Sequence, residues 1–132
     1  MRIPDAVYRI APVLGLFCLN VSVLAAPHHG SAGFSTANVV TFKGTIAEFQ
    51  WTNPHSVIFF DVRDRQGHVD KWVAIINSPN VLTRKGWTRD TLKAGDQVTV
   101  TGYPASNGIH DIYVLQLVRP DGTVLRPNGA AP

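Results

Sequence analysis

The segment that decides the fold runs from Asn38 to Trp51 and reads NVVTFKGTIAEFQW. Its side chains alternate between the two faces of an extended strand, which places Phe49 and Trp51 on the face opposite Ile46. The run is long for a single strand, and Gly44 lies in its middle, where a glycine marks a bulge or a sharp bend. A bend would allow the two ends of this strand to pair with different neighbours.

Four more strands and one helix are predicted after this segment. The strands cover residues 57–62, 69–76, 97–103 and 111–119, with a short return at 123–125, and they are rich in β-branched and aromatic residues. Ser78 and Pro79 predict a helix start, and Gly86 predicts its end near Lys85. Three strands, a helix and two strands predict an all-β fold with one short helix, a small five-stranded OB-like barrel. A plain antiparallel sheet with one helix is the alternative.

The N-terminus has the three parts of a secretory signal. Arg2 and Arg9 form a basic start, an apolar stretch follows, and it ends in small residues at Ala25 and Ala26. Residues 1–25 therefore predict a signal peptide, cleaved after Ala25 or Ala26, and a periplasmic or secreted protein of gram-negative type that does not contact the membrane after cleavage. An uncleaved membrane anchor is the alternative. We expect a flexible leader at 26–37, the barrel at 38–125 and a disordered tail at 126–132.

Composition narrows the class of function. Cleavage removes Cys18, the only cysteine, and leaves 10 basic and 8 acidic residues, so no disulfide or thiol chemistry is available. The net charge of the cleaved chain, near +2, is too small to indicate nucleic acid as a partner. The sequence contains no nucleophile elbow, no suggestively spaced pair of carboxylates, no phosphate-binding glycine loop and no zinc-protease helix, which predicts a protein without catalytic activity.

Two connections carry the candidate ligand-binding residues. Trp51, Asn53 and His55 lie at the first strand connection, and His110 ends the loop before the last long strand. In OB barrels these two connections often flank the ligand. Trp87, after the helix, could line a groove together with Trp51 and stack on a flat ligand, or the two rings could plug the ends of the barrel. Asn53 and His55 could equally serve only to fix the turn. We expect Trp72 in the core and His68 in a solvated hairpin.

His28 and His29 are candidate metal ligands, because imidazole binds copper and zinc. They could be joined by His55 and His110 if the two loops converge. Pro27 lacks the amide that an N-terminal copper chelate needs if cleavage follows Ala25. No other cofactor is expected.

Several elements together resemble the DUF6152 family of exported bacterial proteins. They are His28-His29-Gly30-Ser31, the run Glu48-Phe49-Gln50-Trp51-Thr52-Asn53-Pro54-His55, Ser78-Pro79, Arg84-Lys85-Gly86-Trp87 and the segment from Gly95 to Gly102. The resemblance implies a small exported β-barrel domain and supplies no reaction. The leading hypothesis is an exported, non-enzymatic module that binds a small ligand or a protein. The alternative is a copper- or zinc-binding protein that uses the leader and loop histidines.

Overall fold

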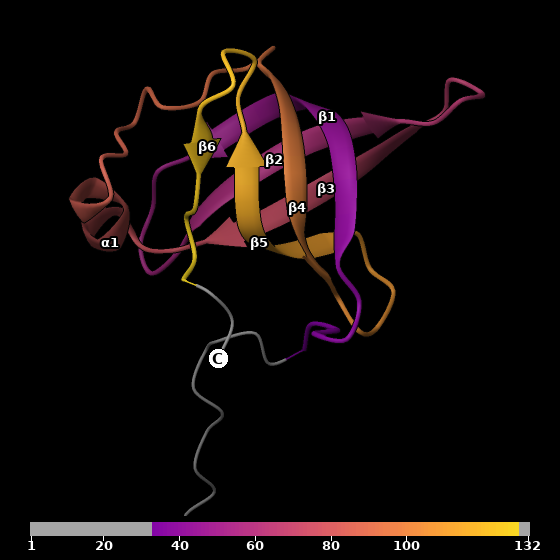
Figure 1. Cartoon of the computed structure of the whole chain (residues 1–132), viewed down its shortest axis with the longest axis horizontal. Coiled ribbons are helices and arrows are strands. Elements are labelled where there is room, and N and C mark those ends of the chain that lie inside the picture. The colour runs from indigo at the N-terminus through magenta and orange to yellow at the C-terminus, as the bar shows by residue number, and fades with distance from the viewer. Residues whose placement is uncertain (1–32, 130–132) are drawn as a thin grey trace, which may run out of the picture.

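Strand β1, Val40–Gln50, pairs with two different neighbours and so bends the sheet (Figure 1). In this computed structural model, which describes residues 33–129, β1 pairs with β4 (Gln97–Pro104) from Val40 to Thr45 and with β2 (Ser56–Arg63) from Thr45 to Gln50. A Cβ atom at Gly44 would lie 2.7 Å from Cδ2 of Phe60. Only glycine fits this close approach. The predicted pairing of the two ends of this strand with different neighbours is confirmed.

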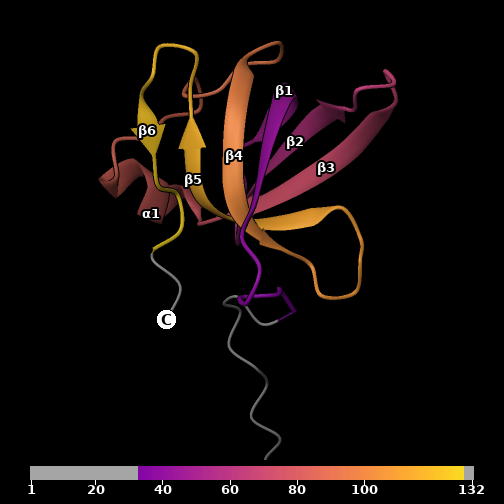
Figure 2. The ribbon, with the colours of Figure 1, turned by 45° about the vertical axis from the view of Figure 1, so that its right-hand side comes forward.

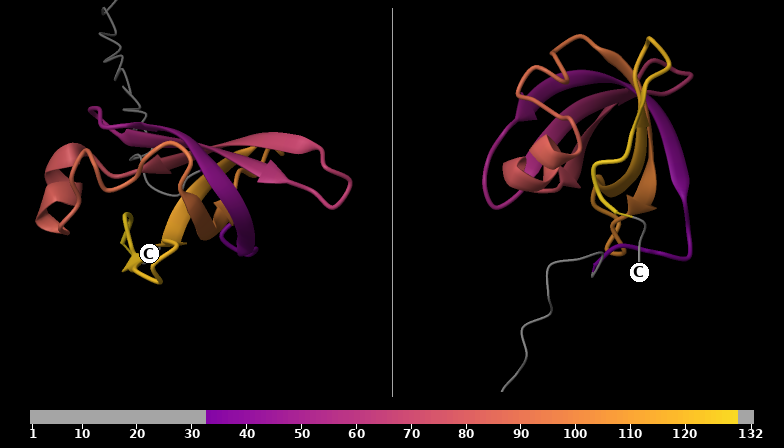
Figure 3. Two further views of the ribbon diagram at one scale, coloured as in Figure 1. Left: turned by 90° about the horizontal axis from the view of Figure 1, so that it is seen from above. Right: turned by 60° about the vertical axis from the view of Figure 1, so that its left-hand side comes forward.

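The barrel closes through a short parallel contact. Strands follow the order β3-β2-β1-β4-β5-β6, and β3 (Val69–Ile76) also pairs with β5 (Asp111–Val118) over Val73–Ile75 and Asp111–Tyr113. Helix α1 (Pro79–Arg84) connects β3 to β4, and β6 (Val124–Leu125) adds to β5. Figure 2 and Figure 3 show the strands curving around one interior. This is the connectivity of the OB barrel, so the predicted fold is confirmed and the open sheet with one helix is wrong.

A bulge in β1 changes which residues face the core. The register with β2 shifts between Ile46 and Glu48, so one residue is added on the β1 side. Phe49 then pairs with the buried Ile58 and, with Trp51, packs against the core. The predicted placement of Phe49 and Trp51 on the face opposite Ile46 is therefore wrong, because the residue added at the bulge reverses the alternation of the side chains that follow it.

The barrel interior is filled by aliphatic and aromatic side chains from all five long strands and the connecting segment. Its fully buried members include Ile46, Ile58, Phe60, Ala74, Ile76, Leu82, Trp87, Val100, Ile112, Val114 and Leu117. Burial of this apolar surface is the main force that holds the barrel together. Within residues 33–129, no helix is long and apolar enough to cross a membrane.

Helix α1 begins and ends where the sequence predicts. Ser78 occupies the N-cap position, but its side chain makes no capping hydrogen bond, and its carbonyl accepts from the amides of Val81 and Leu82. At the other end, Gly86 has φ +83°, a conformation that suits glycine after a helix C-terminus.

The ordered body begins before the predicted start of the barrel. Phe34 forms a β-bridge with Ala105, and the amide of Ser106 donates to the carbonyl of Gly33 at 2.8 Å. Within the predicted leader, Gly33 and Phe34 thus contact the β4–β5 loop. The signal peptide and residues 26–32, with His28 and His29, lie outside the described residues.

Part of the segment predicted as a disordered tail contacts the barrel at Pro127 and Asn128. Asn128 is 4% exposed and its Nδ2 donates to the carbonyl of Ile75 at 3.1 Å, while Asn77 Nδ2 donates to the carbonyl of Pro127 at 3.0 Å. The segment lies beside the end of β3, where the three-residue contact with β5 ends at Ile75 and backbone carbonyls still need partners. Polar composition at a chain end cannot reveal such a contact. Residues 130–132 lie outside the described range.

Candidate functional site

The outside of the barrel is polar on one side. Along the N-terminal half of β1 and along β4, the outward side chains are mainly threonine, and the Oγ1 atoms of Thr41 and Thr101 are hydrogen-bonded at 3.0 Å. Gln97 Nε2 donates to Thr45 Oγ1 at 2.8 Å on the same side. We call this surface, formed by Thr41, Lys43, Gln97, Thr99 and Thr101, the polar exterior. Its composition is that of an ordinary solvated sheet face.

The opposite side of the barrel is apolar. On β2 and β3 the inward positions are occupied by Ile58, Ala74 and Ile76, each at most 1% exposed. The alternate residues therefore face outward. We call this outward set the apolar exterior; it consists of Val57, Phe59, Val73, Ile75 and Tyr113, all half-buried.

The register arranges the apolar exterior in two rows across the strands. Val57 pairs with Ile75, which pairs with Tyr113. Phe59 pairs with Val73 in the second row. Directly opposed side chains on one face contact each other, so the five residues form a continuous surface.

Carboxylates stand at both ends of the second row. Glu48 pairs with Phe59 across β1 and β2, and Asp111 pairs with Val73 across β5 and β3. Among residues 33–129 neither carboxylate forms an ion pair, although Gln50 Nε2 donates to Glu48 at 2.9 Å. The apolar exterior is therefore flanked by uncompensated negative charge.

Three of the predicted ligand-binding residues lie in the connection between β1 and β2. Trp51 is half-buried and packs edge-on against Phe49, with ring centroids 5.8 Å apart. Asn53 is exposed, and the Asn53–Pro54 peptide bond is cis. The Thr52 hydroxyl donates to the carbonyl of His55 at 3.0 Å and stabilises the turn. This connection joins Gln50 to Ser56, so it adjoins the Val57 end of the apolar exterior.

Trp87 does not present a ring face to a ligand. Only 2% of it is exposed, and it contacts Phe49 in the core with ring centroids 6.2 Å apart. Of the two roles predicted for Trp87, its burial supports a ring that plugs an end of the barrel over one that stacks on a ligand. Trp87 is also among the residues that line a surface hollow.

His110 covers a stack of aromatic rings at the other end of the barrel. Its imidazole lies parallel to the indole of Trp72, with centroids 4.7 Å apart and 8° between the planes. Trp72 also contacts Phe42 at 4.3 Å and Phe60 at 6.5 Å. Trp72 is thus half-buried in contact with the core, as predicted, and the exposed His110 closes the stack on the solvent side.

His55 and His110 are not brought together. Ser56, which follows His55, pairs with Ile76, and Asp111, which follows His110, pairs with Val73. The two histidines therefore lie beside different parts of β3. At about 3.3 Å per residue, these parts are about 10 Å or more apart along the strand. The described part of the chain contains no group of three His, Cys, Asp or Glu side chains placed to hold a metal ion. The metal hypothesis therefore depends on His28 and His29, outside that part.

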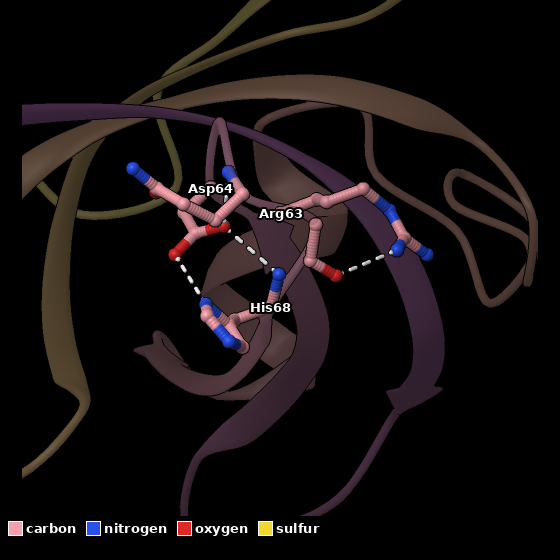
Figure 4. Close-up of polar contacts among 5 residues, drawn as sticks. Arg63, Asp64 and His68 are labelled. Carbon is pink, nitrogen blue, oxygen red and sulfur yellow. Dashed lines mark hydrogen bonds and ion pairs between the residues drawn. The ribbon is translucent and has the colours of Figure 1, made fainter.

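The hairpin between β2 and β3 projects beyond the barrel, at the end opposite α1 (Figure 1), and has a structural role. Asp64 accepts hydrogen bonds from the amides of Gln66 and His68 at 2.8 Å, and its other oxygen lies 3.0 Å from His68 Nδ1 (Figure 4). Desolvation acts to raise the pKa of Asp64, but the hydrogen bonds from His68 and the neighbouring amides outweigh it and lower that pKa. The His68 side chain is 80% exposed, as the sequence predicted.

The residues of the apolar exterior were not singled out from the sequence, although a signal for them exists. In residues 57–60 and 72–76 every position is apolar, whereas a strand with one solvated face alternates. Such runs indicate strands shielded from water on both faces. The structure shows that nothing within residues 33–129 fully buries the outer face of β2 and β3, since its residues remain partly exposed.

Fold and surface define this protein as a small OB-like barrel with one polar and one apolar exterior. The chain belongs to DUF6152, a family of unknown function, whose model matches residues 16–112. Six solved chains match its structure. One is the mitochondrial single-stranded DNA binding protein Rim1 from S. cerevisiae, with 13% identity and a TM-score of 0.47, covering 72% of this chain and 98% of that chain. No curated protein matches the chain in sequence.

Proposed function

We propose that this chain is an exported, non-enzymatic module that binds a protein partner through the apolar exterior. The observation that supports the proposal is the contrast between the two sides of one barrel. Thr41, Thr99 and Thr101 face outward on one side, while the outward residues Phe59 and Val73 on the other side are apolar and half-buried. A contiguous apolar surface on a small protein marks an interaction site, because exposed surfaces of soluble proteins otherwise carry mainly polar side chains.

The shape of the surface favours a protein over a small molecule. Small-molecule sites are concave and enclose most of the ligand. The apolar exterior is the outer face of a sheet, which suits the flat contact between two proteins, whose buried centre is apolar and rich in aromatic residues. Phe59 and Tyr113 would supply its aromatic rings, on either side of Val73 and Ile75.

The flanking charges favour a basic partner. Nucleic-acid sites neutralise phosphates with Lys and Arg. The carboxylates of Glu48 and Asp111 would instead repel phosphates. A two-fold contact between copies of this chain would bring the same carboxylates into one interface. A partner with apolar side chains flanked by Lys or Arg would instead compensate both carboxylates. The DNA-binding activity named for the yeast protein is therefore not proposed here, since a fold does not define a function.

Export is proposed from the N-terminal signal. Arg2 and Arg9 precede an apolar stretch that ends at Ala25 and Ala26. The test is expression of the full chain in a gram-negative host, followed by fractionation and intact-mass measurement. A periplasmic product that starts at Ala26 or Pro27 supports export. A product that keeps residues 1–25 and stays with the cytoplasm or membrane overturns it.

Site-specific photo-cross-linking in the cells that make this protein tests the binding proposal. Benzoylphenylalanine replaces Phe59 in one variant and Thr99, on the polar exterior, in the matched control. We expect one discrete protein adduct from position 59, absent from position 99 and lost when Val73→Asp is added to the position-59 variant. Circular dichroism checks that each variant is folded.

Four results would overturn the binding proposal. They are the absence of any adduct at position 59, equal adducts at both positions, an adduct of nucleic acid, and an adduct of twice the mass of this chain. The last would indicate a second copy as occupant.

Metal binding is a second candidate function. The observation that favours it is the contact of Gly33 with Ser106, which attaches the described start of the chain to the loop that carries His110. We propose titration calorimetry of the mature protein with Cu(II) and Zn(II), beside the variant His28→Ala/His29→Ala. Micromolar or tighter binding that this variant loses supports the candidate; an absence of heat with either metal overturns it.

A further inference from the structure

A separate hollow lies between the end of α1 and β6, which occupy the same side of the barrel in Figure 1. It has a volume of about 340 Å³ and is lined by Lys85, Trp87, Val124, Leu125 and Arg126. This volume is near the lower end of the range for ligand sites, which is about 300–1,000 Å³. The hollow is formed by residues outside the apolar exterior, so its use is independent of the function proposed above.

Three of the residues that line the hollow are apolar. One of them, Trp87, is only 2% exposed. Leu125 is half-buried beside it, and Val124 is 45% exposed at the rim. A hydrocarbon or aryl group placed there would remove the exposed valine and leucine surface from water, which is favourable in proportion to the area covered.

Two cations, Lys85 and Arg126, line the same hollow. Lys85 Nζ donates to the carbonyls of Arg126 and Pro127 at 3.2 Å, which uses two of its three hydrogens. Arg126 Nη2 donates to Gln116 Oε1 at 3.2 Å, and the rest of its guanidinium keeps its donors. No carboxylate among residues 33–129 forms an ion pair with either cation.

We infer that this hollow binds a small organic anion with an apolar body, such as a medium-chain or aryl carboxylate. The carboxylate would accept hydrogen bonds from Arg126 and Lys85, since charge-assisted bonds to a guanidinium are strong and directional. The apolar body would lie against Val124, Leu125 and the edge of Trp87. The volume limits the ligand to a small molecule, and the charge selects an anion over a cation of the same shape.

Two-dimensional NMR of the folded mature protein tests this inference with sodium octanoate as the probe. We expect saturable shifts of the assigned indole N–H of Trp87 and of the backbone amides of Val124 and Leu125. The cation n-octylamine, with the same chain length, is expected to leave these signals in place. Arg126→Gln is expected to weaken octanoate binding about tenfold, and Val124→Asp to abolish it.

Arg65→Gln, in the exposed β2–β3 hairpin, is the matched control and is expected to bind octanoate as the natural protein does. Val124 is exposed, so Val124→Asp leaves the core intact and serves if Arg126→Gln loosens the chain end. The inference is overturned if millimolar octanoate gives no saturable shift, if octylamine shifts the same signals, or if Arg126→Gln and Val124→Asp bind octanoate unchanged.

Discussion

Replacing Gly44 by alanine tests whether the barrel depends on the missing side chain at the bend of β1. The new Cβ would lie 2.7 Å from Cδ2 of Phe60 and 2.9 Å from the carbonyl oxygen of Asp61. Carbon atoms in favourable contact lie about 3.5–4.0 Å apart, so both neighbours would have to move. Phe60 is 1% exposed and Asp61 contributes backbone that pairs with Lys71, so neither moves without disturbing the core or the sheet.

The expected cost of Gly44→Ala follows from these contacts. Overpacking a core costs about 1–3 kcal/mol, and we expect the upper part of that range, about 2–3 kcal/mol, because one of the clashing atoms belongs to the backbone. For a domain of this size, each kcal/mol lowers Tm by about 4–8 °C. The expected decrease in Tm is therefore roughly 8–24 °C.

The sign of the change in stability distinguishes Gly44 from an ordinary glycine in a strand. In an ordinary strand, replacing glycine by alanine stabilises a protein by roughly 0.5–1 kcal/mol, because glycine loses more conformational entropy on folding. Gly129→Ala is the matched control, since a Cβ there meets nothing within 4 Å. Urea unfolding followed by tryptophan fluorescence measures both variants. A Gly44→Ala protein as stable as the natural one, or more stable, would refute the requirement for close approach of β1 and β2.

Three further substitutions test the chain end, the core and the response to pH. Asn128→Ala removes the buried hydrogen bond to Ile75 and should lower the free energy of unfolding by about 1–3 kcal/mol. Asn80 is exposed, so the control Asn80→Ala should change this free energy little. Equal urea midpoints for the two variants would show that the chain end does not stabilise the barrel. Trp87→Ala should cost about 3–5 kcal/mol in the same assay, and a loss below about 1 kcal/mol would contradict its place in the core. Burial, and then the charge of Tyr103, raise the pKa of Tyr113 above its ordinary value of 10.0. The unfolded chain therefore loses this proton first, and stability falls as the pH rises above about 10. Tyr113→Phe should reduce this alkaline loss in thermal melts taken below and above that pH, and an unchanged loss would contradict it.

The candidate site was partly readable from the sequence. The Asn-Pro turn located Trp51 and His55 at the β1–β2 connection, because turn chemistry is local. The apolar exterior could not be predicted from runs such as residues 57–60. A continuous apolar run predicts a strand buried on both faces and does not indicate which face remains exposed to solvent. The stack of Phe42, Trp72 and His110 joins β1, β3 and the β4–β5 loop, which are far apart in sequence, so no local pattern reveals it.

By itself the sequence determined the elements of this protein and singled out Gly44 in its longest strand. Strand composition, Ser78-Pro79 before the helix and Gly86 after it act within a few residues, and so does Gly44, so each leaves a local pattern. The tertiary structure alone decided the phase of β1 beyond its bulge, the contact of β3 with β5 and the burial of Asn128. The physical reason is that hydrogen bonding and packing between distant segments depend on which strands become neighbours, and only closure of the barrel settles that.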